Sequence, residues 1–459
     1  MKNTVLEEAI YHRYIVPTKR KRTKLAGLEF ELPIVNKDNR PVDFEVIHKV
    51  TDAFVRDFSF QKIGRDDDGF IYSAIHEQTG DGLSFDCSYN TVEFSFGTEE
   101  NLNVLYKRFV QYYTYLQKQL SIYAHTLTGM GINPHYTINQ NVPVVSERYR
   151  MLYHHLSSYK NYGQEILFHH YPNFGLFSCA SQIQLDVEEE DLVESLNTFT
   201  KLEPLKALIF ANSAWGEHQE ILCNRDHFWR NSLHGLNRHN VDMYGLEFES
   251  IDEVILYIRS MSLYCVERDG RYVNFRPIPL TQYFSSEAIE GEYFDGNRYQ
   301  KIIVHPEISD LQYLRSFKFN DLTFRGTIEF RSVCEQPVKE IMSPGAFHAG
   351  LMENLSRLTE LLEQDHVIYH KGYNASELRR MFVRKKLPDT FEWTEVSGLL
   401  TKILDIAKEG LHKRGFEEEG FLEPLYRRAE KLLSPAREMA EGIEKGKTLD
   451  DYIEEYGRL

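Results

Sequence analysis

Gly27-Leu28-Glu29-Phe30-Glu31-Leu32 is the stretch that decides the fold, because its acidic and apolar residues alternate. Successive side chains of a β-strand point to opposite faces, so Glu29 and Glu31 share one face. The apolar residues cover the other face, which is typical of a strand with one face in a core. Two ordinary glutamates facing solvent explain the stretch on its own. Metal ligation is the alternative, because buried carboxylates need a partner.

A second strand of the same character lies far along the chain, at Thr327-Ile328-Glu329-Phe330-Arg331. Thr327, Glu329 and Arg331 share one face by the same rule, and two apolar side chains pack behind them. Glu329 and Arg331 have opposite charges and can simply pair with each other. Carboxylate oxygens also suit Mg²⁺, especially Mg²⁺ that is shared with nucleotide phosphates.

The composition narrows the class of protein. The chain has 459 residues, 42% of them hydrophobic, and a formal net charge of −16. Such a chain can bury a large core, and its acidity argues against binding to nucleic acids or to anionic membranes. We expect no signal peptide and no membrane span, because no apolar stretch is long enough. The five cysteines include no CxxC pair, so we expect reduced thiols in a cytoplasmic protein.

One basic run stands out against the acidic composition. Residues 19–22 read Lys-Arg-Lys-Arg and come shortly before the first strand. A solvated face is the ordinary interpretation of such a run, and a nucleotide-binding edge is the sharper alternative.

Helical and strand patterns alternate through the first part of the chain. Apolar spacing predicts helices over residues 42–58, 101–126 and 189–213, the last broken at Pro204. Strands are predicted over residues 177–187, 317–319 and 323–332, with an Asn320-Asp321 turn between the last two. Helical patterns dominate towards the end. The predicted class is α+β, with antiparallel strands and helices in a domain over 1–340 and a helical region over 341–459 packed on it.

Two further pairs of polar residues are candidate ligands. Asp86 ends one predicted strand and Glu93 lies in the next, so a hairpin with its turn at residues 88–90 can bring them together. Gln182 and Gln184 share a face of one strand, where amide oxygens can bind a metal and amide nitrogens can bind phosphate or carboxylate. Ordinary polar residues on the outer face of an antiparallel sheet are the plain explanation for both pairs.

Residues 214–244 form a polar, aromatic and loop-rich segment that contains Arg225 and Trp229. Arginine binds carboxylates and phosphates through two parallel hydrogen bonds, although a surface salt bridge explains Arg225 equally well. The sequence has no GxxxxGK[ST] or GxGxxG phosphate loop, and no HExxH or GxSxG motif. Known nucleotide and hydrolase motifs therefore do not identify the chemistry.

Taken in order, these segments resemble the glutamate–cysteine ligases, within the family of carboxylate–amine ligases that includes the plant-type enzymes. The matching segments and family patterns are 27–31 (GxExE), 131–134 (GxxP), 148–152 (RYxxM), 179–187 (CSxQVxxDF), 208–213 (LxxANS), 225–229 (RxxxW) and 327–331 (YxExR). Residues 407–436 resemble the plant-type AKxGLxxRGxxExGFL…TPAE run. Thr327 stands where the family has tyrosine, and Leu152 where it has methionine.

The resemblance implies a fold and a reaction. The fold would be glutamine-synthetase-like, a curved antiparallel sheet that forms a cup with helices outside, and catalysis would lie in the 1–340 domain. The reaction would join the γ-carboxylate of glutamate to the amine of cysteine through an acyl phosphate made with ATP and Mg²⁺, a step of glutathione biosynthesis. Such chemistry needs positioning and charge neutralisation more than a nucleophilic side chain.

The resemblance also assigns roles to residues. The implied metal ligands are Glu29, Glu31, Asp86, Glu93, Gln182 and Glu329. The implied ATP-binding residues are Glu29, Gln182 and Arg331, and the implied substrate-binding residues are Arg225, Gln184 and Trp229. Arg331 would be catalytic, because it would neutralise the transferring phosphoryl group.

Two alternatives stay open at this point. Residues 231–244 and 277–316 have no close match in the family patterns, so the acceptor can be another amino acid, a polyamine or a peptide. A catalytically silent binding protein is the other alternative, although a silent protein has no use for five converging carboxylates. The expected partners are small molecules (glutamate, an amine and ATP), with no nucleic acid or membrane, in a monomer or homodimer.

Overall fold

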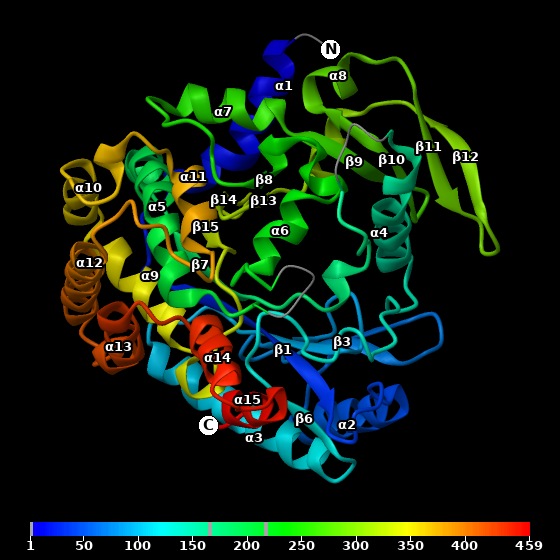
Figure 1. The fold of residues 1–459 in the computed structure, drawn as a ribbon. Helices are drawn as coiled ribbons and strands as arrows, with labels where there is room; N and C mark the ends of the chain where they lie inside the picture. Colours follow the sequence, from blue (N-terminus) through cyan, green and yellow to red (C-terminus); the bar gives the residue numbers. More distant parts are fainter. Residues whose placement is uncertain (1–2, 164–167, 215–218) are drawn as a thin grey trace.

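The computed structural model describes residues 3–163, 168–214 and 219–459 (Figure 1). Its main sheet has nine strands in the order β14-β15-β7-β1-β5-β4-β3-β2, with β6 also paired to β1, and every pairing is antiparallel. The strands are β1 Ala26–Asn36, β2 Lys62–Arg65, β3 Ile71–Ile75, β4 Gly82–Ser84, β5 Thr91–Ser95, β6 His125–Leu127, β7 Ser181–Asp186, β14 Asn320–Leu322 and β15 Thr327–Phe330. The predicted α+β class is confirmed.

The central strand β1 separates an apolar face from a polar one. Leu28, Phe30 and Leu32 are each at most 1% exposed. Phe30 packs edge-on against Phe109 of α3 (Leu102–Ser121), with 5.4 Å between ring centroids. Burial of such side chains stabilises the sheet by about 1.5–3 kcal/mol each. The residues between them, among them Glu29, face the other way, as the alternation predicts.

A second, four-stranded sheet lies beyond the polar face, at the upper right of Figure 1. Its order is β12-β11-β10-β9, from β9 Ser262–Arg268, β10 Arg271–Pro279, β11 Ile289–Phe294 and β12 Tyr299–Val304. Helix α4 (Glu147–Ser157) contacts β10 and β11. The short strands β8 (Val241–Asp242) and β13 (Phe317–Lys318) pair in parallel beside α6 (Asn224–Arg230).

Helices cover the rest of the molecule. The part of the chain before residue 340 contributes α1 Asn3–Ile10, α2 Phe44–Asp57, α5 Glu189–Phe210, α7 Ile251–Ser260 and α8 Leu280–Ser285. The C-terminal helices are α9 Ser343–Glu353, α10 Leu355–Glu363, α11 Ala375–Phe382, α12 Trp393–Arg414, α13 Glu423–Lys431, α14 Pro435–Glu444 and α15 Leu449–Tyr456. Helix α9 packs against β1, β7 and α12. The predicted helical C-terminal region is confirmed, and the boundary at residue 340 stays a prediction.

Two predicted helices have different limits. Helix α3 ends at Ser121, and the residues predicted to complete it lead into β6, which pairs with β1. Helix α5 runs without a break through Pro204, where the sequence predicted one. Every residue from Leu202 to Phe210 is buried, so packing on both sides of the proline outweighs its lost hydrogen bond.

The predicted Asn320-Asp321 turn is wrong. Both residues belong to β14, which pairs with β15, and the chain turns over residues 323–326 instead. Gly326 has φ +76°, a conformation that glycine adopts easily. The amide of Asn320 donates a 3.0 Å hydrogen bond to the carbonyl of Leu196, so tertiary contact outweighs its turn propensity.

The outer surface bears on two predictions. Within 3–163, 168–214 and 219–459, no helix has both the length and the apolarity needed to cross a bilayer. In the basic run, Arg20 pairs with Asp186 at 2.9 Å, and Arg22 pairs with Glu353. These contacts are in keeping with the plain interpretation of the run, a charged outer face.

Candidate active site

Strand pairing brings the acidic residues of distant segments together. Strand β1 places Glu29 opposite Gln182 of β7, and Glu31 opposite Glu93 of β5. Directly opposed residues have Cβ atoms about 4.5–5.5 Å apart, and like charges at that distance repel. A cation between Glu31 and Glu93 would remove this repulsion.

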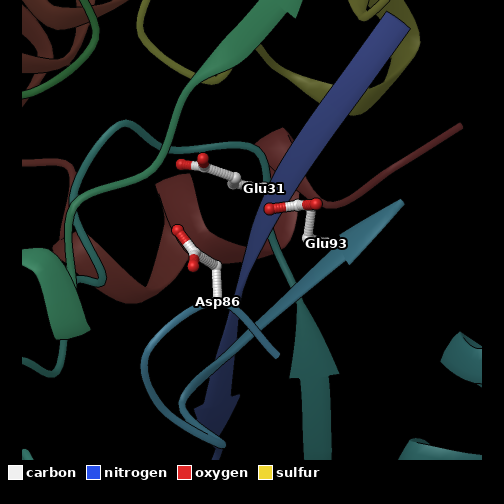
Figure 2. Close-up of side chains that lie close together, drawn as sticks. All are labelled: Glu31, Asp86 and Glu93. Atoms are coloured by element: carbon white, nitrogen blue, oxygen red, sulfur yellow. The ribbon is translucent and has the colours of Figure 1, made fainter. Parts of the chain in front are cut away.

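Glu31, Asp86 and Glu93 point towards one another (Figure 2). One carboxylate oxygen from each lies within 4.8 Å of the other two. The Tyr149 hydroxyl of α4 donates to Oδ1 of Asp86 at 3.1 Å, and the Ser84 hydroxyl donates to Oε1 of Glu93 at 3.2 Å. The β4–β5 connection brings Asp86 to Glu93, as a hairpin was expected to do. Their role as metal ligands stays a prediction.

Burial and mutual repulsion raise the pKa of three carboxyl groups. Burial, followed by the charge of Asp86, raises the pKa of Glu31 to about 8. Burial, followed by the charge of Glu329, raises the pKa of Glu29 to about 7. Burial and the charges of Glu29 and Asp86 hold the pKa of Glu93 well above its ordinary value. A bound divalent cation would stabilise the ionised forms, so this set of oxygens fits Mg²⁺.

Glu29, Gln184 and Glu329 form a second cluster on the same face. The amide nitrogen of Gln184 lies 3.3 Å from Oε1 of Glu29 and 3.4 Å from Oε1 of Glu329, and donates to both. Arg331 donates to Oε2 of Glu329 at 2.8 Å, so these two residues do pair. Burial opposes the charge of Arg331, but Glu329 and Asp321 outweigh it and raise the pKa of the guanidinium. Arg331 therefore stays cationic beside the carboxylates.

Gln182 connects the sheet to the acidic trio. Its amide nitrogen donates to Oε1 of Glu31 at 2.9 Å. Its amide oxygen is buried and finds no hydrogen-bond partner among the described residues. An unsatisfied buried acceptor costs about 1–3 kcal/mol, and a cation or a ligand donor would satisfy it.

Arg225 and Trp229 lie on α6, within the segment that was predicted to be loop-rich; residues 215–218 of that segment lie outside the described residues. Arg225 is 6% exposed and donates to the carbonyl oxygens of Arg331, Ser332 and Val333 at 3.2–3.4 Å. The guanidinium therefore anchors the segment that carries Arg331, rather than forming a surface salt bridge. The ring of Trp229 lines the cavity beside it.

Two cavities open onto this face. The smaller has a volume of about 150 Å³ and contains Glu31, Asp86, Gln182, Arg225 and Trp229 in its lining. The larger has a volume of about 380 Å³ and is lined by Glu29, Gln184 and Glu329, with Tyr14, Tyr244 and Phe324. Arg148, Arg315 and Arg331 line both. The predicted site residues therefore line two adjoining cavities, with the exception of Glu93. Glu93 lies behind the wall of the smaller cavity, next to Glu31 and Asp86.

Several residues of the site escaped the sequence prediction. Asp321 lines the larger cavity, and burial followed by Glu329 raises its pKa to about 7; its assignment to a turn concealed it. Tyr149 and Arg148 lie in the RYxxM-like segment, which gave a usable signal. Arg315 and His234 come from unmatched segments, and no sequence pattern marked them.

Comparison with known proteins places the chain in a family. A family model described as glutamate-cysteine ligase family 2 matches residues 25–455. The chloroplastic glutamate–cysteine ligases of Solanum lycopersicum and Arabidopsis thaliana are each 22% identical over 343 residues, 71% of this chain. The match covers 60% of each plant protein, so the chain spans little more than half the length of these relatives.

A solved structure also resembles the chain. The glutamate–cysteine ligase of Francisella tularensis, crystallised in complex with AMP, has a TM-score of 0.47 and 10% sequence identity. The likeness covers 95% of this chain and 87% of that one.

Proposed function

The chain belongs to glutamate-cysteine ligase family 2, and we propose that it joins the γ-carboxylate of glutamate to the amine of cysteine with the conversion of ATP to ADP. The observation that carries the proposal is the acidic trio Glu31, Asp86 and Glu93, placed beside two cavities that share three arginines. A binding protein without catalysis has no need of buried carboxyl groups, such as those of Glu31 and Glu93, whose pKa values are raised.

The larger cavity suits ATP. Tyr14, Tyr244 and Phe324 offer flat apolar surfaces to the base, while Glu29 and Glu329 lie where the phosphates would be. The residues that would hold Mg²⁺ are Glu31, Asp86 and Glu93 with the free oxygen of Gln182, and Glu29 with Glu329. Mg²⁺ held by these residues would offset the negative charge of the phosphates and the charge that develops during transfer.

The smaller cavity suits glutamate and the acceptor. A γ-carboxylate oxygen attacks the terminal phosphorus of ATP, and the bond from that phosphorus to ADP breaks. The acceptor ammonium gives up one proton to water, and the free amine nitrogen then attacks the acyl carbon. Phosphate leaves with the bonding electron pair and takes up the second proton from that nitrogen. Arg331 lies between the cavities and would neutralise the phosphoryl group in both steps. Arg225 would support it by holding the backbone of residues 331–333 in place.

Two arginines favour an acceptor that carries a carboxylate. Arg148 contacts the ring of Tyr149, and Arg315 donates to the carbonyls of Gln312 and Leu314. Neither forms an ion pair within the part of the chain that the structure describes. The charge of Asp86 acts on Arg148 from beyond ion-pair distance, so the carboxylate of an α-amino acid would be the first to bond either guanidinium directly, whereas a polyamine would add cations to a cationic wall. Another amino acid is the second candidate acceptor.

The test measures ADP formation when the protein is incubated with ATP, Mg²⁺, glutamate and each amine of a panel in turn. We expect release to require glutamate together with an amine, and to be fastest with cysteine. Faster turnover with another amino acid would identify that amino acid as the acceptor and would leave the proposed acyl-phosphate chemistry unchanged. Absence of stimulation by every pair would instead support a silent binding protein. Cytoplasmic localisation and a monomeric or homodimeric state stay predictions.

A further inference from the structure

His234 stands in the wall of the smaller cavity, in a segment with no close match to the family patterns. It lies in the 3₁₀ turn Leu233–Leu236 and is 5% exposed. A buried histidine most often belongs to the core and is satisfied there, so its neighbours and hydrogen bonds decide its role.

Aromatic rings fix the position of the imidazole. Its centroid lies 4.2 Å from that of Phe317, 5.5 Å from that of Trp229 and 5.2 Å from that of Tyr264. The guanidinium of Arg331 lies 5.8 Å from the centroid of Phe317, on a ring that His234 also contacts. The imidazole is therefore held in a rigid wall, one ring away from the residue that would face the acyl phosphate.

Among the described residues, His234 has no hydrogen-bond partner. Nδ1 is buried without a partner, and no group within the described ranges forms a hydrogen bond with the ring. Burial, followed by the neighbouring His155, holds the pKa of His234 well below its ordinary value, so the ring is neutral. Nδ1 is too deeply buried for a ligand to reach, whereas Nε2 is not among the buried unpartnered atoms, so Nε2 is the nitrogen that accepts a hydrogen bond when the proton lies on Nδ1.

We propose that His234 binds the acceptor substrate by accepting a hydrogen bond from its ammonium group. This inference rests on the proposed function. His234 would bind the amino end of the acceptor, and Arg148 or Arg315 would bind its carboxylate. A neutral acceptor suits a cation, and the aromatic faces of Trp229 and Phe317 add attraction. The acceptor is thus an α-amino acid bound at both ends, with its nitrogen at the imidazole and one aromatic ring away from Arg331.

A water molecule between two histidines is the competing explanation. His155 is 1% exposed, its Nε2 is also buried without a partner, and its ring centroid lies 5.9 Å from that of His234. A shared buried water would satisfy both rings. Such a water would make His234 structural, and its loss would change stability rather than the affinity for one substrate.

Three variants separate these explanations. His234→Phe keeps the ring stack and removes the acceptor, His234→Gln restores an acceptor, and His155→Phe serves as the control because His155 does not line the cavity. We expect His234→Phe to raise the KM for cysteine about tenfold or more, as expected for a lost hydrogen bond to a charged group. The KM values for ATP and glutamate should stay within twofold, and His234→Gln should recover most of the loss.

Binding of cysteine, measured by calorimetry with glutamate and a non-hydrolysable ATP analogue, gives a readout that does not depend on turnover. Weaker binding to His234→Phe and unchanged binding to His155→Phe would support the proposal. Equal effects of both substitutions, or unchanged cysteine binding to a folded His234→Phe, would overturn it. Wild-type protein that binds cysteine without turnover would contradict the proposed ligase activity and leave this test of His234 intact.

Discussion

Glu31 of β1 lies directly opposite Glu93 of β5, and Asp86 reaches the same point from the loop between β4 and β5. Three carboxylates thus converge on a buried face where water solvates them poorly. Burial, followed by the charges of neighbouring carboxylates, raises the pKa of Glu31 and of Glu93, and a divalent cation would offset both effects. The acidic trio is therefore unfavourable without a cation and well suited to one.

Substituting Glu93→Gln tests the trio through catalysis. The change removes one negative charge and keeps the shape, so we expect kcat to fall at least a hundredfold, because electrostatic stabilisation of the transferring phosphoryl group is lost. The thermal midpoint without metal should stay the same or rise. Glu99→Gln, four residues after the end of β5 and outside the acidic trio, is the control. Full activity of Glu93→Gln would show that Glu93 is not a metal ligand.

The stability of the metal-free protein should depend on pH. The folded pKa values of Glu29 and Glu31 are about 7 and 8, above the ordinary value of 4.5, so the folded state binds more protons than the unfolded state. The stability that this provides is fully present below pH 4.5 and is lost as pH rises through about 7 to 8. Calorimetry in EDTA should therefore give a lower Tm at pH 8.5 than at pH 6.

Magnesium should reverse this trend. Its binding to the ionised carboxylates should raise the Tm more at pH 8.5 than at pH 6. A double variant, Glu29→Gln with Glu31→Gln, should lose most of both effects. An equal Mg²⁺ shift at the two pH values in the wild type would contradict the cation site.

The hydroxyl of Tyr149 should tune the affinity for metal. It holds Oδ1 of Asp86, and loss of such an outer partner typically weakens metal binding by about 10–100-fold. We expect Tyr149→Phe to raise the Mg²⁺ concentration for half-maximal activity about tenfold, with a smaller change in kcat at saturation. Tyr153→Phe, an exposed change on the same helix, should have no effect. Unchanged Mg²⁺ dependence in Tyr149→Phe would show that Asp86 needs no such support.

Arg148 should discriminate between acceptors that have a carboxylate and those that lack one. Cysteamine is cysteine without its carboxylate, so the wild type should prefer cysteine. We expect Arg148→Gln to lower kcat/KM for cysteine about tenfold or more, as for a lost charged hydrogen bond, and to leave that for cysteamine nearly unchanged. A parallel loss for both amines would assign Arg148 to glutamate or ATP instead.

The sequence predicts the parts of the site that depend on strand alternation. The two-residue repeat of a β-strand correctly placed Glu29 and Glu31 on one face of β1. It also placed Glu329 and Arg331 on one face at the end of β15. It could not supply the order of strands, which decides that β7 and β5 flank β1. Residue propensity also misled where tertiary contacts outweigh it, as at Pro204 inside α5 and at Asp321 in β14.

Residues outside the family patterns show a different limit. His234 and Arg315 reach the cavities from a short turn and an irregular segment, where neither periodicity nor spacing marks a functional side chain. Their surroundings in space indicate their function: among the described residues, the ring of His234 forms no hydrogen bond and the guanidinium of Arg315 forms no ion pair.

The fate of the γ-carboxylate oxygens of glutamate tests the central claim most directly. Glutamate labelled with ¹⁸O at the γ-carboxylate is incubated with the protein, ATP, Mg²⁺ and cysteine, and the products are analysed by mass spectrometry. Ligation through an acyl phosphate predicts one ¹⁸O atom in each inorganic phosphate released and one in the γ-glutamyl amide. Phosphate free of ¹⁸O, released while the amide forms, would contradict it.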